Sequence, residues 1–256
     1  MLNFRSIMDI EANEWLIALG LTEQEIPDTV IVEGSWWRAQ RQEWRLGLLS
    51  DVRELNFPDI YWGRWKDTKV AFCMAYGAPR TVEIMHLFGV LGTKLAVQIG
   101  TCGGLQTHLN PGDIVVPNVA IGREGVAHMY STDATRGTTQ WLDRAQTQLK
   151  SRQHTVYRGT HMTWSSLFTE TVNMMEVWHH AGYLSVDMET ATTYAVAQHF
   201  GMSAVSMLVV WDELTSGRRF LDPLTDEEQT KLDRANASVF DAALELTEMV
   251  AEEVNS

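Results

Sequence analysis

Apolar stretches of strand length alternate with stretches of helix length along most of this chain. Four of the apolar stretches cover residues 29–34, 68–77, 95–105 and 202–214, and each is nearly continuous rather than alternating with polar residues. Continuous apolar runs are typical of strands that are buried on both faces. Strands separated by helices of roughly 10–15 residues predict an α/β fold with a central mixed, mostly parallel sheet flanked by helices.

The remaining pattern fits the same interpretation. Further strands are expected at 112–121 and 155–166, and an extended segment from 184 leads into a helix. Other helices are expected at 38–49, 79–92, 169–182 and 226–254. Because no linker interrupts the pattern, residues 1–256 are expected to form a single domain, with a helical leader at residues 1–28.

Composition excludes several classes of function. The chain has 33 acidic and 20 basic residues, a net charge of -13. This excess argues against a nucleic acid or an anionic membrane as partner. The cysteines, Cys73 and Cys102, form no disulfide framework. We find no signal peptide and no apolar run near the ~20 residues of a membrane-spanning helix. A cytoplasmic location is expected.

Polar residues gather where the predicted strands end, which is where α/β sheets bind ligands. Thr101 lies in the glycine-rich GTCGGL loop, which could cradle an anion or a hydroxyl group. Asp187 and Glu189 are two residues apart on an extended segment, so both carboxyl groups could point into one pocket. Asp212 follows the apolar run MLVVW, and such a carboxyl can have a raised pKa and act as a general acid.

Each feature also has a purely structural explanation. The glycine loop could be a tight turn, the acid pair could begin a helix, and Asp212 could be a helix cap. Trp36 and Trp37 could line a pocket for a flat heterocycle, although core packing is the commoner role of tryptophan. The eight histidines lack metal-site spacing, so no metal is expected. The absence of a G-x-G-x-x-G fingerprint argues against a dinucleotide-binding oxidoreductase.

Six segments, taken in order, resemble the nucleoside phosphorylase superfamily of purine nucleoside phosphorylases, uridine phosphorylases and methylthioadenosine nucleosidases. They are VEGSWWR, YGAPRT, QIGTCGGL with GDIVVP, SSLF, SVDMETATTYAVA and VVWDE. Together they extend from about residue 30 to the C-terminal helix. The combination of the glycine loop, DMET and a strand-end aspartate is far more specific than any one of them.

The resemblance implies a central sheet that closes partly into a barrel and a nucleoside bound at the strand ends. Glu189 would accept hydrogen bonds from the ribose hydroxyls, with Met188 against the sugar and Asp187 nearby. Phe168 would stack on the base, and Asp212 would protonate the leaving base. An acid at the position of Asp212 favours a purine.

The resemblance also implies a phosphate site, from which this chain departs. Gly34 and Arg38 match the phosphate-binding loop, and Thr101 matches a loop hydroxyl. Gln98 stands where a second arginine is expected, and a charge-assisted bidentate donor is thereby lost. The arginine that a neighbouring subunit would supply has no clear counterpart. Arg64, Arg218 and Arg219 are the alternatives.

Phosphorolysis of a purine nucleoside to free base and ribose 1-phosphate is therefore the leading expectation. Phosphate would be the co-substrate, and no cofactor is expected. Hydrolysis by water, as in the methylthioadenosine nucleosidases, is the alternative, because Gln98 weakens the case for phosphate. A third hypothesis is that the chain is a catalytically inactive nucleoside-binding domain. The resemblance further implies a homo-oligomer, either a dimer or a hexamer.

Overall fold

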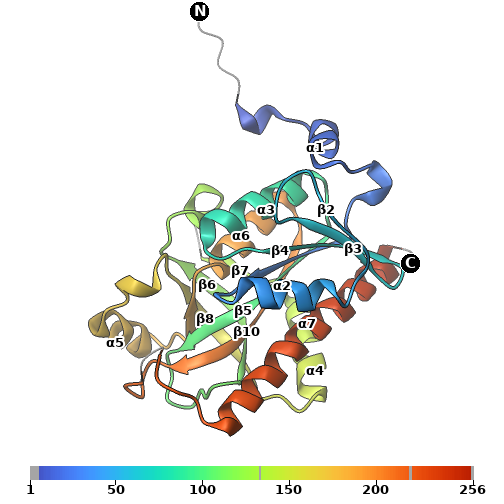
Figure 1. Cartoon of the computed structure of the whole chain (residues 1–256). Coiled ribbons are helices and arrows are strands. Elements are labelled where there is room, and N and C mark those ends of the chain that lie inside the picture. The colour runs from blue at the N-terminus through green and yellow to red at the C-terminus, as the bar shows by residue number, and fades with distance from the viewer. Residues whose placement is uncertain (1–5, 133, 219–220, 255–256) are drawn as a thin grey trace, which may run out of the picture.

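The computed structural model describes residues 6–132, 134–218 and 221–254, and Figure 1 shows a central sheet between layers of helices. The strands are β1 (Thr29–Gly34), β2 (Ser50–Glu54), β3 (Tyr61–Trp65), β4 (Thr68–Met74), β5 (Leu95–Gly104), β6 (Ile114–Gly122), β7 (Thr135–Arg136), β8 (Val156–Thr163), β9 (Ser185–Asp187) and β10 (Ser203–Glu213).

The helices alternate with these strands. They are α1 (Ala12–Leu19), α2 (Arg38–Leu46), α3 (Ala78–Val90), α4 (Thr139–Ser151), α5 (Val172–His180), α6 (Thr190–Phe200) and α7 (Asp226–Val254). Short 3-10 helices lie at η1 (Ile7–Asp9), η2 (Glu23–Glu25), η3 (Ala127–Met129) and η4 (Leu167–Thr169). No helix in the described parts of the chain is both long and apolar enough to cross a membrane.

One mixed sheet connects all the strands in the order β10-β6-β8-β9-β5-β1-β4-β3-β2, with β7 paired to β6. Strand β10 also pairs with β5, in parallel, so β5, β9, β8, β6 and β10 close into a five-stranded barrel. The longest registers are parallel, notably β1 with β5, β5 with β10, and β6 with β8. The predicted α/β class, the mixed sheet and its partial barrel closure are confirmed.

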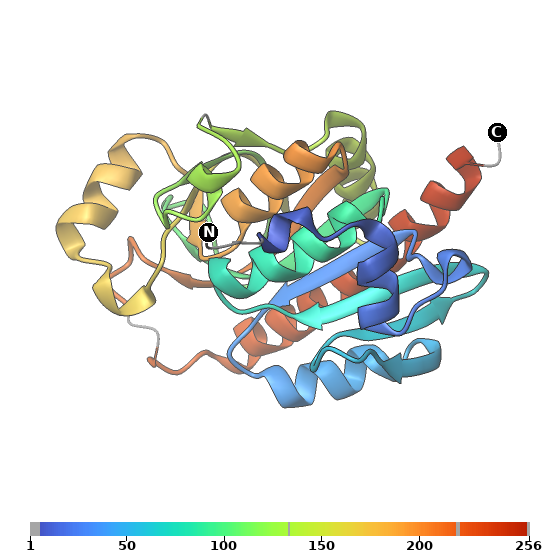
Figure 2. The same cartoon turned by 90° about the horizontal axis from the view of Figure 1, so that it is seen from above.

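Strand periodicity separates two cores on the two faces of the sheet. In β1, Val30 and Val32 join a cluster with α3 and α6, whereas Ile31 joins the cluster with α4 and α7. Figure 2 shows α3 and α6 together over one face. Successive side chains alternate between the faces. The same alternation in β5 places Gln98 on the α6 side, because Val97 and Ile99 belong to the opposite cluster.

Three elements were not predicted, namely the antiparallel β2–β3 hairpin, β7 and α4. Most residues of β2 are exposed and polar, so the strand lacks the apolar run that marks a buried strand. It extends the sheet only because β3 pairs with β4 and β2 with β3. In the leader, α1 packs Trp15, Leu16 and Leu19 into the core cluster of α3 and α6.

Candidate active site

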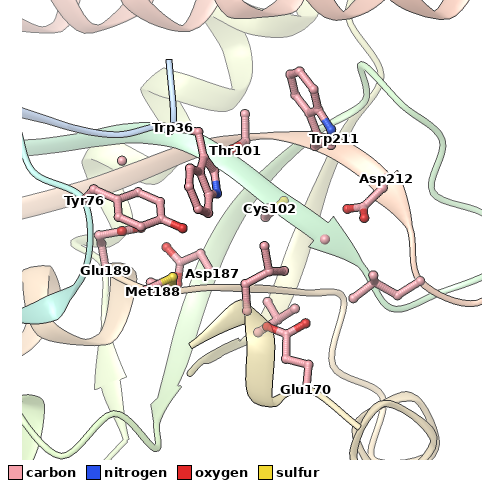
Figure 3. A pocket seen from close by; sticks show the side chains of 15 residues that line it. Trp36, Tyr76, Thr101, Cys102, Glu170, Asp187, Met188, Glu189, Trp211 and Asp212 are labelled. Carbon is pink, nitrogen blue, oxygen red and sulfur yellow. The ribbon is translucent and has the colours of Figure 1, made fainter. Parts of the chain in front are cut away.

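A pocket lies at the carboxyl ends of β1, β4, β5, β9 and β10, where the sheet geometry predicts a ligand site. Figure 3 shows side chains converging on it from these strand ends and from the connection between β8 and α5. The pocket is lined by Gly34, Trp36, Tyr76, Thr101, Cys102, Gly103, Leu167, Glu170, Val186, Asp187, Met188, Glu189, Trp211, Asp212 and Leu214.

Glu189 stands at one end of the pocket, next to the start of α6. The backbone N–H of Gly77 donates a 2.6 Å hydrogen bond to Glu189 Oε1. A Cβ placed on Gly34 would lie 2.6 Å from Glu189 Oε2, so this position of β1 must remain glycine for the carboxyl to occupy its site. Backbone from β1 and from the start of α3 thus fixes the Glu189 carboxyl.

The electrostatics of Glu189 favour a neutral or ligand-bound carboxyl. Burial raises its pKa, and the nearby charge of Asp187 raises it further, although hydrogen bonds from the Gly77 and Met188 backbone lower it; the resulting pKa is about 8. A buried carboxyl with spare acceptor capacity suits ligand hydroxyl groups, which can replace the lost water.

Asp212 stands at the other end of the pocket, near the end of β10. Burial raises its pKa to about 6, opposed by its own backbone N–H and by the charge of Arg218. A general acid works best when its pKa is near the working pH. Asp212 therefore has the location and the pKa of a general acid that could donate a proton to one end of a bound molecule.

Glu170 is a second carboxyl group at this end of the pocket, and it was not among the predicted site residues. It follows η4, and Figure 3 shows its carboxyl pointing into the pocket across from Asp212. Burial raises the pKa of Glu170 to about 7, and the charge of Asp212 contributes to the rise. The sequence pattern places Glu170 in the helix expected at 169–182, whereas α5 begins at Val172 and leaves Glu170 in the connection before it.

Aromatic rings form the walls between the carboxyl groups. Trp36 packs against Tyr76, with ring centroids 5.4 Å apart, and Trp211 stacks on Trp37 at 4.3 Å. Trp36 is 47% exposed, so it lines the pocket and is not a core residue. The sequence left two roles open for Trp36, a pocket wall and core packing, and the structure places Trp36 in the pocket wall. Flat walls of this kind suit a flat ring.

Asp187 borders the pocket, but its carboxylate is occupied by the protein. Oδ1 accepts hydrogen bonds from His161 Nε2 (2.8 Å) and Thr163 Oγ1 (2.9 Å). Oδ2 accepts from Gln98 Nε2 (3.1 Å) and from the Thr190 N–H (3.0 Å). Burial alone would raise the pKa of Asp187, but His161 and these hydrogen bonds lower it below its usual range.

This network holds two residues that were predicted to contact a ligand. Asp187 was expected to face the ligand beside Glu189, but its oxygens are held by interior donors. Gln98 was expected in the phosphate site, but it is fully buried and does not line the pocket. Its amide donates to Asp187, and its Oε1 lies 2.8 Å from the Thr190 hydroxyl. The glutamine therefore completes the hydrogen-bond network of the Asp187 carboxylate on the α6 side of β5.

The other predicted residues are placed as follows. Met188, Thr101 and Gly34 line the pocket, whereas Arg38 is exposed and lines an adjoining cavity with Tyr76 and Arg80. Phe168 is 82% exposed and meets Trp36 edge-on at 6.1 Å, so it sits at the mouth and its neighbour Leu167 lines the pocket instead.

Two of the three alternative arginines, Arg64 and Arg218, do not line the pocket. Arg64 lies on β3 near Asp51, with a side chain 41% exposed. Arg218 is paired with Glu228 at 2.6 Å, near the start of α7, and acts on Asp212 only through its charge. Arg219 lies outside the described residues. Among the described residues that line the pocket, none is lysine or arginine.

Comparison with known proteins agrees with this architecture. The chain is 24% identical over 237 residues to a DeoD-type purine nucleoside phosphorylase of Exiguobacterium sp., covering 90% of this chain and 99% of that protein. It is 24% identical over 204 residues to a guanosine phosphorylase of Halorubrum lacusprofundi, covering 77% and 83%. A crystal structure of uridine phosphorylase from Vibrio fischeri superposes with a TM-score of 0.75 at 20% identity, covering 88% and 93%.

A match to a family model accompanies these pairwise similarities. The model of the phosphorylase superfamily matches residues 55–250, which include β5, β9, α6 and β10 and most of the pocket. The pocket at the strand ends, the five-stranded barrel and this match lead to one conclusion: the chain belongs to the phosphorylase superfamily.

Proposed function

We propose that this protein cleaves the N-glycosidic bond of a purine nucleoside by phosphorolysis, giving the free base and ribose 1-phosphate. The observation that carries the proposal is the placement of Glu189 and Asp212 at opposite ends of one aromatic-walled pocket. A nucleoside has two hydroxyls at one end and a ring nitrogen that must be protonated at the other. The purine relatives from Exiguobacterium and Halorubrum support the choice of base.

The chemistry follows from the two carboxyl groups. As the bond from the sugar carbon to the base breaks, its electron pair moves to the base, and positive charge develops on the sugar. Asp212, protonated below its pKa of about 6, donates a proton to the base and neutralises it. Glu189 binds the sugar hydroxyls and fixes the sugar as the nucleophile attacks.

Phosphate is the proposed nucleophile because three of the expected groups gather near the sugar end. Gly34 and Thr101 line the pocket there, and Arg38 lies beyond Tyr76 in the adjoining cavity. The charge of Arg38 acts on the Tyr76 hydroxyl, which shows that the guanidinium is within electrostatic range of the wall.

The test is a product analysis with adenosine, guanosine, inosine and uridine, each with and without phosphate. The expected result is base release that requires phosphate and yields ribose 1-phosphate, faster for the purine nucleosides than for uridine. Release of base and free ribose at equal rates with and without phosphate would contradict phosphorolysis. Faster cleavage of uridine would contradict the choice of base.

Replacing Arg38 by methionine tests the nucleophile site separately. The expected result is a KM for phosphate raised about 10- to 100-fold, with the KM for the nucleoside changed much less, because one charge-assisted contact is lost. Initial rates at varied phosphate measure it. The control is Arg53→Met, which removes an arginine paired with Glu25, remote from the pocket lining. Equal effects of the two substitutions would contradict the role of Arg38.

Hydrolysis is a second candidate, and one observation favours it. The described pocket lining carries several carboxyl groups and no cationic side chain. Phosphate is an anion, and its binding there is opposed by Asp212, Glu170 and Glu189 whenever these are ionised. The same product analysis distinguishes the two reactions.

A further inference from the structure

A second cavity lies between α2 and α7, which Figures 1 and 2 both show next to each other. Its volume of about 510 Å³ falls within the range of roughly 300–1,000 Å³ that is usual for small-molecule sites. We call it the α2–α7 cavity. The indoles of Trp37, Trp44 and Trp211 line it, together with Arg41, Asp233 and Asn236.

The residues that face the α2–α7 cavity follow the helical repeat on both sides. A stripe that closes a contact between two helices is normally apolar. Here both stripes are aromatic and polar, so they form the walls of a cavity and not a packed contact. With the spacing i, i+4, i+7, they are Trp37, Arg41 and Trp44 on the side of α2, and Gln229, Asp233 and Asn236 on α7.

Trp211 connects the α2–α7 cavity to the active-site pocket, because it lines both. The pairing of β10 with β5 slips by one residue between Val210 and Asp212, so Trp211 is the extra residue of a β-bulge. Its indole stacks on Trp37, with ring centroids 4.3 Å apart and planes inclined by 27°. Trp36 and Asp212, which are adjacent to these two indoles in the sequence, line the active-site pocket. A ligand against this stack therefore lies one residue away from Asp212.

The charged groups around the α2–α7 cavity balance one another. Arg41 Nη1 lies 3.1 Å from Glu33 Oε1 and donates a 2.7 Å hydrogen bond to Asn236 Oδ1. Arg45 makes a second ion pair with Glu33 at 2.9 Å, so two positive charges share one negative charge. Asp233 supplies a further negative charge from α7. A lining of this kind suits a neutral ligand.

The polar groups of the lining can pair with both donors and acceptors. Within the described residues, both hydrogen bonds of Arg41 use Nη1, which leaves donors on Nε and Nη2. Asp233 Oδ1 accepts a 2.9 Å hydrogen bond from Gln229, and its carboxylate keeps further acceptor capacity. The amide of Gln40 adds a donor and an acceptor. The matching ligand therefore carries donors and acceptors on its own edge.

We propose that the α2–α7 cavity is a second ligand site, which binds a free purine base. A purine base is neutral, its edge alternates donors and acceptors, and its faces stack on aromatic rings. Trp37 and Trp44 expose indole rings for such stacking. An inorganic anion is disfavoured by Asp233, and a free sugar has no flat ring to stack. The site goes beyond the proposed function, because no step of the cleavage uses it, and contact with Trp211 couples it to the active-site pocket.

The experiment uses Leu167→Trp as its background, because the added ring fills the active-site pocket and Leu167 does not line the α2–α7 cavity. Calorimetric titration with hypoxanthine and with adenine is expected to show one base bound per chain. Adding Trp44→Leu should raise the Kd about 5- to 100-fold, the usual effect of losing one aromatic platform under a base. Gln229→Trp, at an exposed position, fills the α2–α7 cavity and should abolish binding even if Trp44→Leu does not fold.

The matched control is Trp65→Leu, which removes a half-buried indole outside both cavities and should leave the Kd unchanged. Absence of base binding in the Leu167→Trp background would overturn the proposal, as would a Kd that neither Trp44→Leu nor Gln229→Trp alters. Equally tight binding of inorganic phosphate or ribose would overturn the choice of ligand. A lower sedimentation coefficient in Trp44→Leu would show that a second copy of the chain covers the cavity, which also contradicts the proposal. None of these outcomes depends on whether the protein cleaves nucleosides.

Discussion

Replacing Asp212 with asparagine is expected to lower kcat for a purine nucleoside by about 10²- to 10⁴-fold, the usual contribution of a positioned general acid. Asparagine has nearly the same shape and can still donate a hydrogen bond, but it cannot transfer a proton to the leaving base. Steady-state kinetics with inosine or guanosine, at saturating phosphate, measure the loss. The change is expected mainly in kcat, since the ground-state contacts of the nucleoside are retained.

The general-acid role of Asp212 also predicts the direction in which kcat/KM changes with pH. Because burial raises the pKa of Asp212 to about 6, the protonated and active form is present below that pH and is lost as the pH rises through it. The wild-type kcat/KM is therefore expected to fall above pH 6, and the Asp212→Asn profile should lack this fall. Glu170, with a pKa of about 7, titrates nearby, so the comparison is repeated in Glu170→Gln to separate the two groups.

Two controls make the Asp212 result specific. A riboside whose leaving group is a nitrophenolate needs no proton, so Asp212→Asn should cleave it within a few-fold of the wild-type rate. Glu213→Gln changes the adjacent acid, which does not line the pocket, and should leave both rates nearly unchanged. An equal loss on both substrates would refute the general-acid role and point to a structural effect of the substitution.

Replacing Asp187 with alanine is expected to lower the free energy of unfolding by about 3–5 kcal/mol. The substitution removes the shared acceptor of His161, Thr163, Gln98 and Thr190, all of which are fully buried. Buried donors would then lose the acceptor that compensates for their removal from water. Urea denaturation followed by circular dichroism measures the change.

Two control variants separate the loss of a buried carboxylate from the loss of an exposed one and from the loss of charge alone. Asp143→Ala removes a carboxylate whose side chain is 64% exposed and paired with Arg158, so it should cost less than about 1 kcal/mol. Asp187→Asn keeps one acceptor oxygen and should cost less than alanine, which provides a measurable variant if alanine does not fold. A loss below 1 kcal/mol in Asp187→Ala would contradict the view that the network stabilises the fold.

The sequence predicted the buried strands because burial on both faces demands a continuous apolar run. The strand at residues 29–34 was predicted with the bounds that β1 has, and the strand-end rule located Thr101 and Asp212 at the pocket. The β2–β3 hairpin escaped prediction in part because β2 lies at the edge of the sheet, and edge strands need not be apolar. Its position depends on pairing with β4, which is a tertiary contact.

The site was predicted less completely, for a different physical reason. A residue type at the right position does not determine where its side chain finds partners. Gln98 stands at an expected ligand position, but Asp187 and Thr190 complete its hydrogen bonds inside the protein. Glu170 was expected in a helix that begins at residue 169, but it lies in the connection between η4 and α5, and only the folded chain brings it opposite Asp212.

The close approach of Gly34 to Glu189 divides the pocket into a part that cannot be redesigned and a part that can. A Cβ on Gly34 would collide with the Glu189 carboxyl, and one on Gly100 would lie 2.6 Å from the Gly34 carbonyl oxygen, so side chains cannot be varied on this floor. The opposite wall, with Leu167 and Glu170, belongs to the segment of η4 and its connection to α5, where both side chains are half-buried. A directed-evolution library confined to that wall should yield enzymes with new base preferences and an unaltered sugar requirement.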